Sequence, residues 1–262
     1  MKTAKVEGLA LALIANSEPV YIKAYGLADV ESHRPLTTRT VMYAASLTKA
    51  AFATMVLQLV VEAVTGKSAG DLMQARIFVP FGMTRTSMTW RADFRIDFAH
   101  GYEPDGTMVG HHMWRKAGAA GSMDTTISDF AKFLAAVEGG ALLSPRAQSE
   151  MLRPQVAIHT KTEFPVLRPE IPGQNEDIAL SYGLGWGLFR TPFGEAFFKE
   201  GHDAGTSNCA LCLKDRGLCI LMLSNDNRAE GIFKYMVDKL VGDVHLPWRW
   251  EGYVPYDRRK AP

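Results

Sequence analysis

Apolar residues gather in short continuous runs near both ends of the chain. The first two runs, 8–14 and 19–25, are separated by Asn16-Ser17-Glu18, a polar triplet typical of a hairpin turn. Four more runs follow in the last third of the sequence: 182–189, 196–200, 208–213 and 218–223. A four-residue loop that ends in Gly217 joins the last two of them. We therefore expect strands at both ends of the sequence, connected largely as hairpins.

The middle of the chain is patterned for helices. Residues 46–64 are apolar on nearly all sides, which predicts a buried helix rather than an amphipathic one, and Gly66 is suited to end it. Further helices are predicted at 69–77, 126–137, 144–152 and 230–241. Residues 84–121 and 154–178 lack a regular period, so we expect irregular structure there, with short strands in the first of the two. The order of elements favours an α+β fold, in which helices cover an antiparallel sheet.

The N-terminal segment has two interpretations. A basic start followed by the apolar run 8–14 faintly resembles a signal peptide, but Glu7 interrupts it and no clear cleavage site precedes Ser17. A buried first strand is the favoured interpretation. The longest apolar stretch, 50–64, carries two polar residues, so no membrane span is predicted. We expect a cytoplasmic protein, with a periplasmic or secreted one as the alternative.

Composition narrows the function classes. The 262 residues are 47% apolar and 22% charged, the balance of a soluble globular protein, and we expect a single domain over 1–262. A net charge of +1 without a basic run predicts no nucleic-acid partner. Three cysteines do not make a disulfide framework, and Cys209 and Cys212 are expected to be core thiols. The pair His111-His112 has no neighbouring ligands, so neither a metal nor another cofactor is predicted.

The candidate chemistry lies in Ser46-Leu47-Thr48-Lys49. Residues three apart share one face of a helix, so the Ser46 hydroxyl and the Lys49 amine can touch. A serine needs a base to become a nucleophile, and apolar neighbours push a lysine toward the neutral form that can serve as one. The start of a helix also favours negative charge. The alternative is that Ser46 only caps the helix and Lys49 is a surface residue.

Six blocks of sequence decide between these interpretations. They occur in one order along nearly the whole chain: Tyr25–Glu31, Ala45–Ala50, Ile77–Met83, Ala120–Thr126, Ser181–Trp186 and Glu200–Gly205. Together they resemble the serine β-lactamase-like family, which includes class C β-lactamases, penicillin-binding DD-peptidases and related esterases. The resemblance implies a β-lactamase/transpeptidase-like antiparallel sheet flanked by helices.

The same resemblance implies roles for individual residues. Ser46 is the nucleophile and Lys49 the base. His202 takes the place of the family's second motif, Lys-Thr-Gly or His-x-Gly, and lines the pocket as an auxiliary group; the alternative is a structural loop histidine. The N–H groups of Ser46 and Gly205 form the oxyanion hole, whose two fixed donors stabilise the tetrahedral intermediate. Ala204 stands where the family usually has glycine, and its methyl group can crowd the substrate.

The chain departs from the family pattern in one large respect. The family's third motif contains a tyrosine and lies in a helical lobe inserted after the Ser-x-x-Lys helix; here the flanking helices are fused and no tyrosine occurs between Tyr43 and Tyr102. Tyr43 is expected in the core, and neither Tyr102 nor Tyr182 is a supported substitute. The reduced lobe predicts a wetter cleft that keeps Lys49 protonated. It also leaves surface that favours self-association or domain exchange.

These features predict a serine hydrolase that forms an acyl-enzyme, acts most readily on small carboxylic esters and uses no cofactor. An open cleft favours esters over β-lactams, because a ring amide needs a placed proton donor at its leaving nitrogen. One alternative is a β-lactamase or a DD-peptidase-type penicillin-binding protein. Another is a catalytically silent homologue that acts as a binding scaffold.

Overall fold

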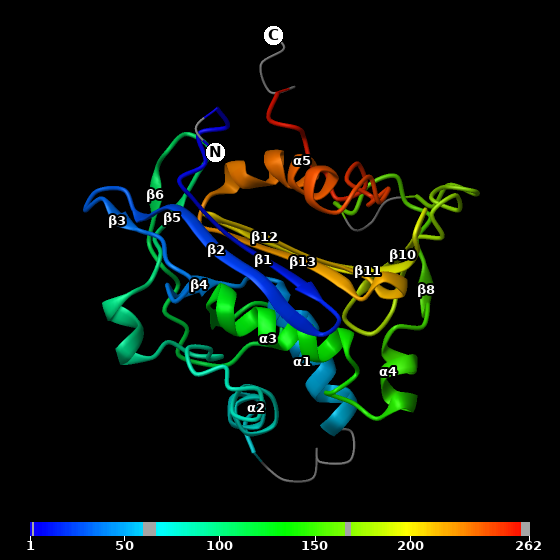
Figure 1. The fold of residues 1–262 in the computed structure, drawn as a ribbon, viewed down its shortest axis with the longest axis horizontal. Helices are drawn as coiled ribbons and strands as arrows, with labels where there is room; N and C mark the ends of the chain where they lie inside the picture. Colours follow the sequence, from blue (N-terminus) through cyan, green and yellow to red (C-terminus); the bar gives the residue numbers. More distant parts are fainter. Residues whose placement is uncertain (2, 60–66, 166–168, 258–262) are drawn as a thin grey trace.

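A nine-stranded antiparallel sheet forms the centre of the computed structural model, which describes residues 1, 3–59, 67–165 and 169–257 (Figure 1). Its strands, in spatial order, are β3 (Arg34–Pro35), β2 (Glu18–Asp29), β1 (Gly8–Ala15), β13 (Leu218–Ser224), β12 (Thr206–Leu213), β11 (Gly194–Asp203), β10 (Gly187–Thr191), β9 (Ser181–Tyr182) and β8 (Val156–Ala157). Two small pairs lie outside it: β4 (Met42–Tyr43) with β7 (Asp124–Thr125), and β5 (Gly101–Tyr102) with β6 (Met108–Val109). The α+β class expected from the sequence is therefore confirmed.

The N-terminal hairpin forms as predicted. Asn16 and Ser17 both have left-handed backbone conformations, with φ of +50° and +63°, which suits the twist of a two-residue hairpin turn. β1 lies between β2 and β13 in the middle of the sheet, and most of its residues are buried. The interpretation of 8–14 as a buried strand is thus confirmed.

Some predicted boundaries were wrong. The single strand expected at 182–189 is two strands, β9 and β10, because the chain turns at Gly185, whose φ is +86°. A Cβ at Gly185 would lie 2.4 Å from the Cβ of Ala53, so the turn also brings the backbone close against α1 (Leu47–Leu59). β11 continues three residues beyond its predicted end, which places His202 on a strand.

The helices occur where the sequence predicts them. Besides α1 they are α2 (Ala69–Met73), α3 (Ile127–Glu138), α4 (Pro145–Met151) and α5 (Glu230–Leu240). A π-helical turn, Gln74–Phe78, continues α2. The end of the helix predicted at 46–64, with Gly66, lies outside the described residues. No helix within the described ranges is long and apolar enough to cross a membrane.

The helices cover both faces of the sheet. α1 and α3 lie against one face and α5 against the other (Figure 1). Because side chains alternate along a strand, neighbours on β11 enter different cores: Phe197 packs with α1 and α3, and Phe198 packs beneath α5. α1 continues without a break through 55–57, the junction where the family's lobe would be inserted. The expected reduced lobe is consistent with this continuous helix.

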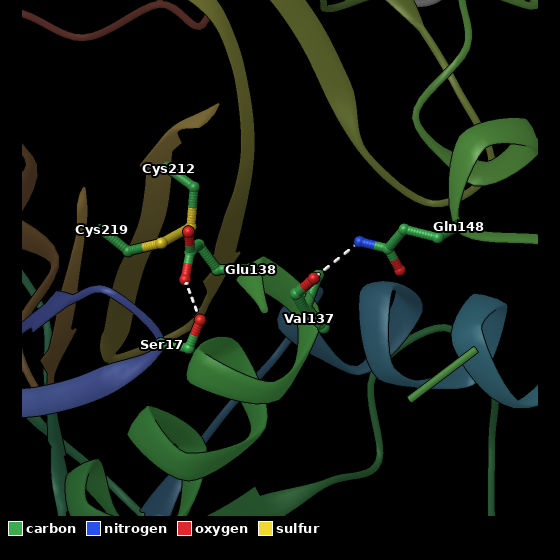
Figure 2. The surroundings of a disulfide bond; sticks show 6 residues. All are labelled: Ser17, Val137, Glu138, Gln148, Cys212 and Cys219. Atoms are coloured by element: carbon green, nitrogen blue, oxygen red, sulfur yellow. Dashed lines mark hydrogen bonds between the residues drawn. A yellow bond between two sulfur atoms is a disulfide. The ribbon is translucent and has the colours of Figure 1, made fainter. Parts of the chain in front are cut away.

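One expectation about the cysteines was wrong. Cys212 and Cys219 lie directly opposite each other on β12 and β13 and form a disulfide (Figure 2). The register of β12 and β13, rather than the spacing of the cysteines along the sequence, sets the partner of Cys212. Cys209 is a free, buried thiol, as predicted. Beside the disulfide, Ser17 Oγ donates a hydrogen bond of 2.7 Å to Glu138 Oε2 and ties the first hairpin to the end of α3 (Figure 2).

Candidate active site

The candidate nucleophile lies at the junction of β4 and α1. Ala44 N–H donates to Met123 O at 2.9 Å, which fixes the end of β4 against the segment that leads into β7. Ala45 then has a left-handed backbone, with φ of +45°. Residues other than glycine rarely adopt this backbone conformation, and such strained residues are concentrated at functional sites. It turns the chain sharply, so that half-buried Ser46 sits immediately before the first residue of α1.

Lys49 and Ser46 meet as the spacing predicts. The Lys49 Nζ donates to Ser46 Oγ at 2.5 Å and to the carbonyl oxygen of Ala120 at 2.8 Å. Burial lowers the pKa of Lys49 below its ordinary value, and the nearby charge of Lys199 adds to this; the carboxylates of Glu200 and Glu163 oppose it. The environment therefore shifts Lys49 toward the neutral amine.

A cleft of about 460 Å³ opens beside this pair. Its lining joins β4, the start of α1, the 114–122 segment and the end of β11: Tyr43, Ala45, Ser46, Lys49, Trp114, Gly118, Ala120, Gly121, Ser122, His202 and Asp203. The cleft is thus walled mainly by small residues and by two aromatic rings. Three of the predicted site residues, Ser46, Lys49 and His202, come together in it.

His202 has a partner that the sequence did not reveal. Its Nδ1 lies 2.5 Å from Glu230 Oε1 at the start of α5. Burial opposes the charged imidazolium, but the hydrogen bond and charge of Glu230, with further carboxylates beyond it, raise the pKa of His202. Because a carboxylate oxygen accepts, the bond holds Nδ1 as the donor. The two residues are 28 positions apart, and only the packing of α5 on the sheet joins them.

The N–H of Gly205 bonds to a neighbouring side chain in this structure. With Ala204 it forms the turn between β11 and β12, and its φ is +71°. The Gly205 N–H donates to Asn227 Oδ1 at 2.6 Å. Neither Ala204 nor Gly205 is among the described residues that line the cleft with Ser46; both border a separate small cavity. The amide of Gly205 is therefore not offered to a substrate in this structure, and the Ala204 methyl does not narrow the cleft.

Tyr43 contributes its hydroxyl to the cleft although it is buried, as expected. The hydroxyl donates to Gly121 O at 2.5 Å and lies 3.2 Å from Asp203 Oδ2. Burial, with the negative charge of Asp203, raises the pKa of Tyr43 well above its ordinary value. Tyr43 thus keeps its proton and cannot replace the missing tyrosine as a base. Tyr102 accepts from Val30 N–H instead, outside the cleft lining.

A buried pair supports the strand that carries Tyr43. His111 Nε2 lies 2.8 Å from Asp124 Oδ1, and both side chains are at most 2% exposed. His111 Nδ1 is 3.0 Å from Ala99 O, which can only accept, so Nδ1 carries a proton. Asp124 is the residue of β7 that pairs with Tyr43. This histidine is structural, and no group of metal donors found among the described residues includes it.

Known proteins resemble the chain in sequence. A family model described as Beta-lactamase matches residues 1–62 and 51–242. Penicillin-binding protein 4 of Amycolatopsis lactamdurans is 26% identical over 204 residues, which cover 72% of this chain and 50% of that protein. The chain thus spans about half the length of the curated relative that it matches.

Solved structures resemble it in fold. The octameric penicillin-binding protein homologue from Pyrococcus abyssi superposes with a TM-score of 0.77 at 16% identity, covering 99% of this chain and 78% of the other. The D-alanine carboxypeptidase AmpC from Burkholderia cenocepacia gives a TM-score of 0.67 at 17% identity, covering 87% and 90%. At such identities the likeness concerns the fold alone.

Proposed function

Because the chain belongs to the Beta-lactamase family, we propose that it is a serine hydrolase that forms an acyl-enzyme on Ser46. The observation that carries the proposal is the 2.5 Å hydrogen bond between Lys49 Nζ and Ser46 Oγ inside an open cleft. A serine beside a lysine whose pKa is lowered is the arrangement that an activated nucleophile needs.

In the proposed acylation, the neutral Lys49 amine takes the proton of the Ser46 hydroxyl as Oγ attacks the carbonyl carbon of an ester. The carbon–oxygen bond to the alcohol then breaks, and the Lys49 ammonium returns the proton to the leaving alkoxide. In deacylation, Lys49 takes a proton from water as the water oxygen attacks the acyl carbon. The bond from that carbon to Ser46 Oγ then breaks, the Lys49 ammonium returns the proton to Oγ, and the carboxylic acid leaves. General acid–base transfer of this kind contributes about 10²- to 10⁴-fold in rate.

The developing oxyanion needs fixed donors. We expect the Ser46 N–H, at the start of α1, to supply one, because helix N-termini favour negative charge. His202 lines the same cleft, and its raised pKa favours a positive charge there. For Gly205 to supply the second donor, its N–H must release Asn227 Oδ1 and bond to the substrate instead.

Small esters are the proposed substrates. The leaving alkoxide of an ester can take its proton from Lys49 alone. The leaving nitrogen of a ring amide needs a second proton donor held close to it. Among the described residues that line the cleft the tyrosine is Tyr43, and its hydroxyl is directed to Gly121 and Asp203. Trp114 and Ala120 give the cleft apolar surface that suits a short acyl chain.

The relatives' names favour a second candidate function. Penicillin-binding and D-alanine carboxypeptidase activities belong to those proteins, and they make a β-lactam or D-alanyl peptide the alternative substrate. A silent binding scaffold is the third candidate, favoured by the reduced lobe. Hydrolysis assays separate the three.

The test compares p-nitrophenyl acetate, p-nitrophenyl butyrate and a chromogenic cephalosporin. We expect hydrolysis of the esters by the wild-type protein, loss of that activity in Ser46→Ala, and no loss in the control Ser149→Ala, which changes an exposed serine on α4. Faster turnover of the cephalosporin than of the esters would favour the β-lactamase candidate. If the folded protein turns over none of these substrates, the silent binding scaffold is the candidate that remains.

We also propose that the chain self-associates. The Pyrococcus homologue is described as octameric, and this chain exposes large apolar side chains, among them Ile96 (82% exposed) and Val20 (62% exposed). Light scattering coupled to gel filtration should give a mass that is a multiple of the 28.9 kDa chain. A single species of one chain mass would refute this part of the proposal.

A further inference from the structure

Three glutamates from distant parts of the sequence meet at β11. Glu200 lies on β11, Glu163 in the segment between β8 and β9, and Glu251 in the C-terminal segment that follows α5. One carboxylate oxygen from each lies within 4.8 Å of the other two. Glu200 is 4% exposed and Glu251 is 8% exposed. No part of the proposed hydrolysis uses this cluster.

Most of the carboxylate oxygens in the cluster lack a partner. Both oxygens of Glu251, Glu200 Oε2 and Glu163 Oε2 are buried without a hydrogen-bond partner among the described residues. Lys199 pairs with the other oxygen of Glu200. Burying a charged group without a partner costs several kcal/mol, so folded proteins pair such groups or use them to coordinate a metal. Both oxygens of the buried Glu251 carboxyl group are therefore open to a cationic ligand.

We propose that Glu163, Glu200 and Glu251 bind one divalent cation, and that calcium fits the site best. Three carboxylates and the Lys199 ammonium leave a formal charge of −2, which one divalent ion neutralises. The donors are all carboxylate oxygens, the ligands of hard cations. Calcium–oxygen bonds of about 2.3–2.6 Å allow opposite ligands up to about 5 Å apart, whereas the shorter bonds to magnesium allow only about 4.2 Å. The three carboxylate oxygens lie at most 4.8 Å apart, so all of their separations fall within the span that calcium allows.

The cation joins three segments that the sheet alone does not hold together. Glu251 is 51 positions from Glu200, and Glu163 is 37 positions from it on the other side. An ion that ligates all three fixes the C-terminal segment and the segment after β8 onto β11. Bound protons are the competing occupants: burial raises the pKa of Glu163 to about 7 and that of Glu251 well above its ordinary value when no cation is present.

Calcium chloride titrated into chelator-treated full-length protein tests the site. We expect one calcium ion per chain by isothermal titration calorimetry. We expect the melting temperature to rise by about 5 °C at a calcium concentration 100 times the Kd. Magnesium chloride should bind at least tenfold more weakly. Absence of both heat and thermal shift up to about 10 mM calcium, beyond the range of weak protein sites, would overturn the proposal. Equal affinity for magnesium would overturn the choice of calcium.

Variants assign the binding to these residues. Glu251→Gln keeps the shape of the side chain and removes its charge, so it should abolish the calcium-dependent shift. Glu163→Gln, at a less buried position, should weaken binding at least tenfold and serves as the second variant if Glu251→Gln does not fold. Glu176→Gln changes an exposed glutamate in the same irregular region and should bind like the wild-type protein. Unchanged calcium binding in both cluster variants would refute the assignment.

Discussion

Replacing Gly201 with alanine should disturb the active site without touching a reacting group. Gly201 lies on β11 immediately before His202, with its Cα facing the turn that carries Ser46. An added Cβ would lie 2.8 Å from Ala44 O, 3.0 Å from Leu47 N and 3.2 Å from Ser46 N. All three are backbone atoms, which cannot move aside as a flexible side chain can.

The magnitude follows from the overlap. The closest contact is about 0.6 Å shorter than an ordinary van der Waals contact, so either β11 or the start of α1 must move. Overpacking of this kind costs about 1–3 kcal/mol of stability. A displacement approaching 1 Å at a nucleophile costs up to about 100-fold in rate. We therefore expect Gly201→Ala to lower the melting temperature by about 2–6 °C and kcat for ester hydrolysis by about 10- to 100-fold.

The assay measures kcat, KM and thermal unfolding for wild type, Gly201→Ala and Gly110→Ala. Gly110 has no atom within 4 Å of an added Cβ and is the matched control. The control should behave like the wild-type protein. The same kcat and melting temperature in Gly201→Ala as in wild type would refute the close packing of β11 on the nucleophile turn.

Three further predictions concern titratable groups. Since burial lowers the pKa of Lys49, the rate of ester hydrolysis should rise with pH and level off below pH 10.5. A rate that does not change between pH 6 and pH 10 would contradict the role of Lys49 as the base. The raised pKa of His202 contributes stability below pH 6.5, and this stability is lost as the pH rises through the pKa of the folded state. Glu230→Gln should therefore destabilise the protein most near pH 6, as urea unfolding at several pH values can show. An equal loss of stability at all pH values would refute the pairing. Asp124→Asn should lower the free energy of unfolding by about 3–5 kcal/mol, because it breaks the buried pair with His111. A loss of less than about 1 kcal/mol would contradict a structural role for this pair.

Much of the fold could be predicted because its elements carry local signals. The apolar runs and the Asn16-Ser17 turn indicate the first hairpin, and a stretch apolar on all sides indicates a helix buried against the sheet, as α1 is. Ser46 and Lys49 could also be predicted to touch, because helical geometry alone brings together residues three apart.

The rest depends on tertiary packing. Nothing near His202 in the sequence indicates Glu230, and nothing near Gly205 indicates that Asn227 accepts its N–H. Ala45 has a left-handed backbone although it is not a glycine, so nothing in the local sequence signals the turn. The disulfide of Cys212 likewise follows from the register of two strands, which the spacing of cysteines does not contain.

The central claim is that Lys49 activates Ser46 in spite of the reduced lobe. Intact-mass detection of a fluorophosphonate adduct tests it most directly, with wild type beside Ser46→Ala and Lys49→Ala and with Ser149→Ala as control. We predict one adduct per chain on wild type and on the control, and none on the other two variants. No adduct on folded wild-type protein, or an adduct that persists in Ser46→Ala, would contradict the account.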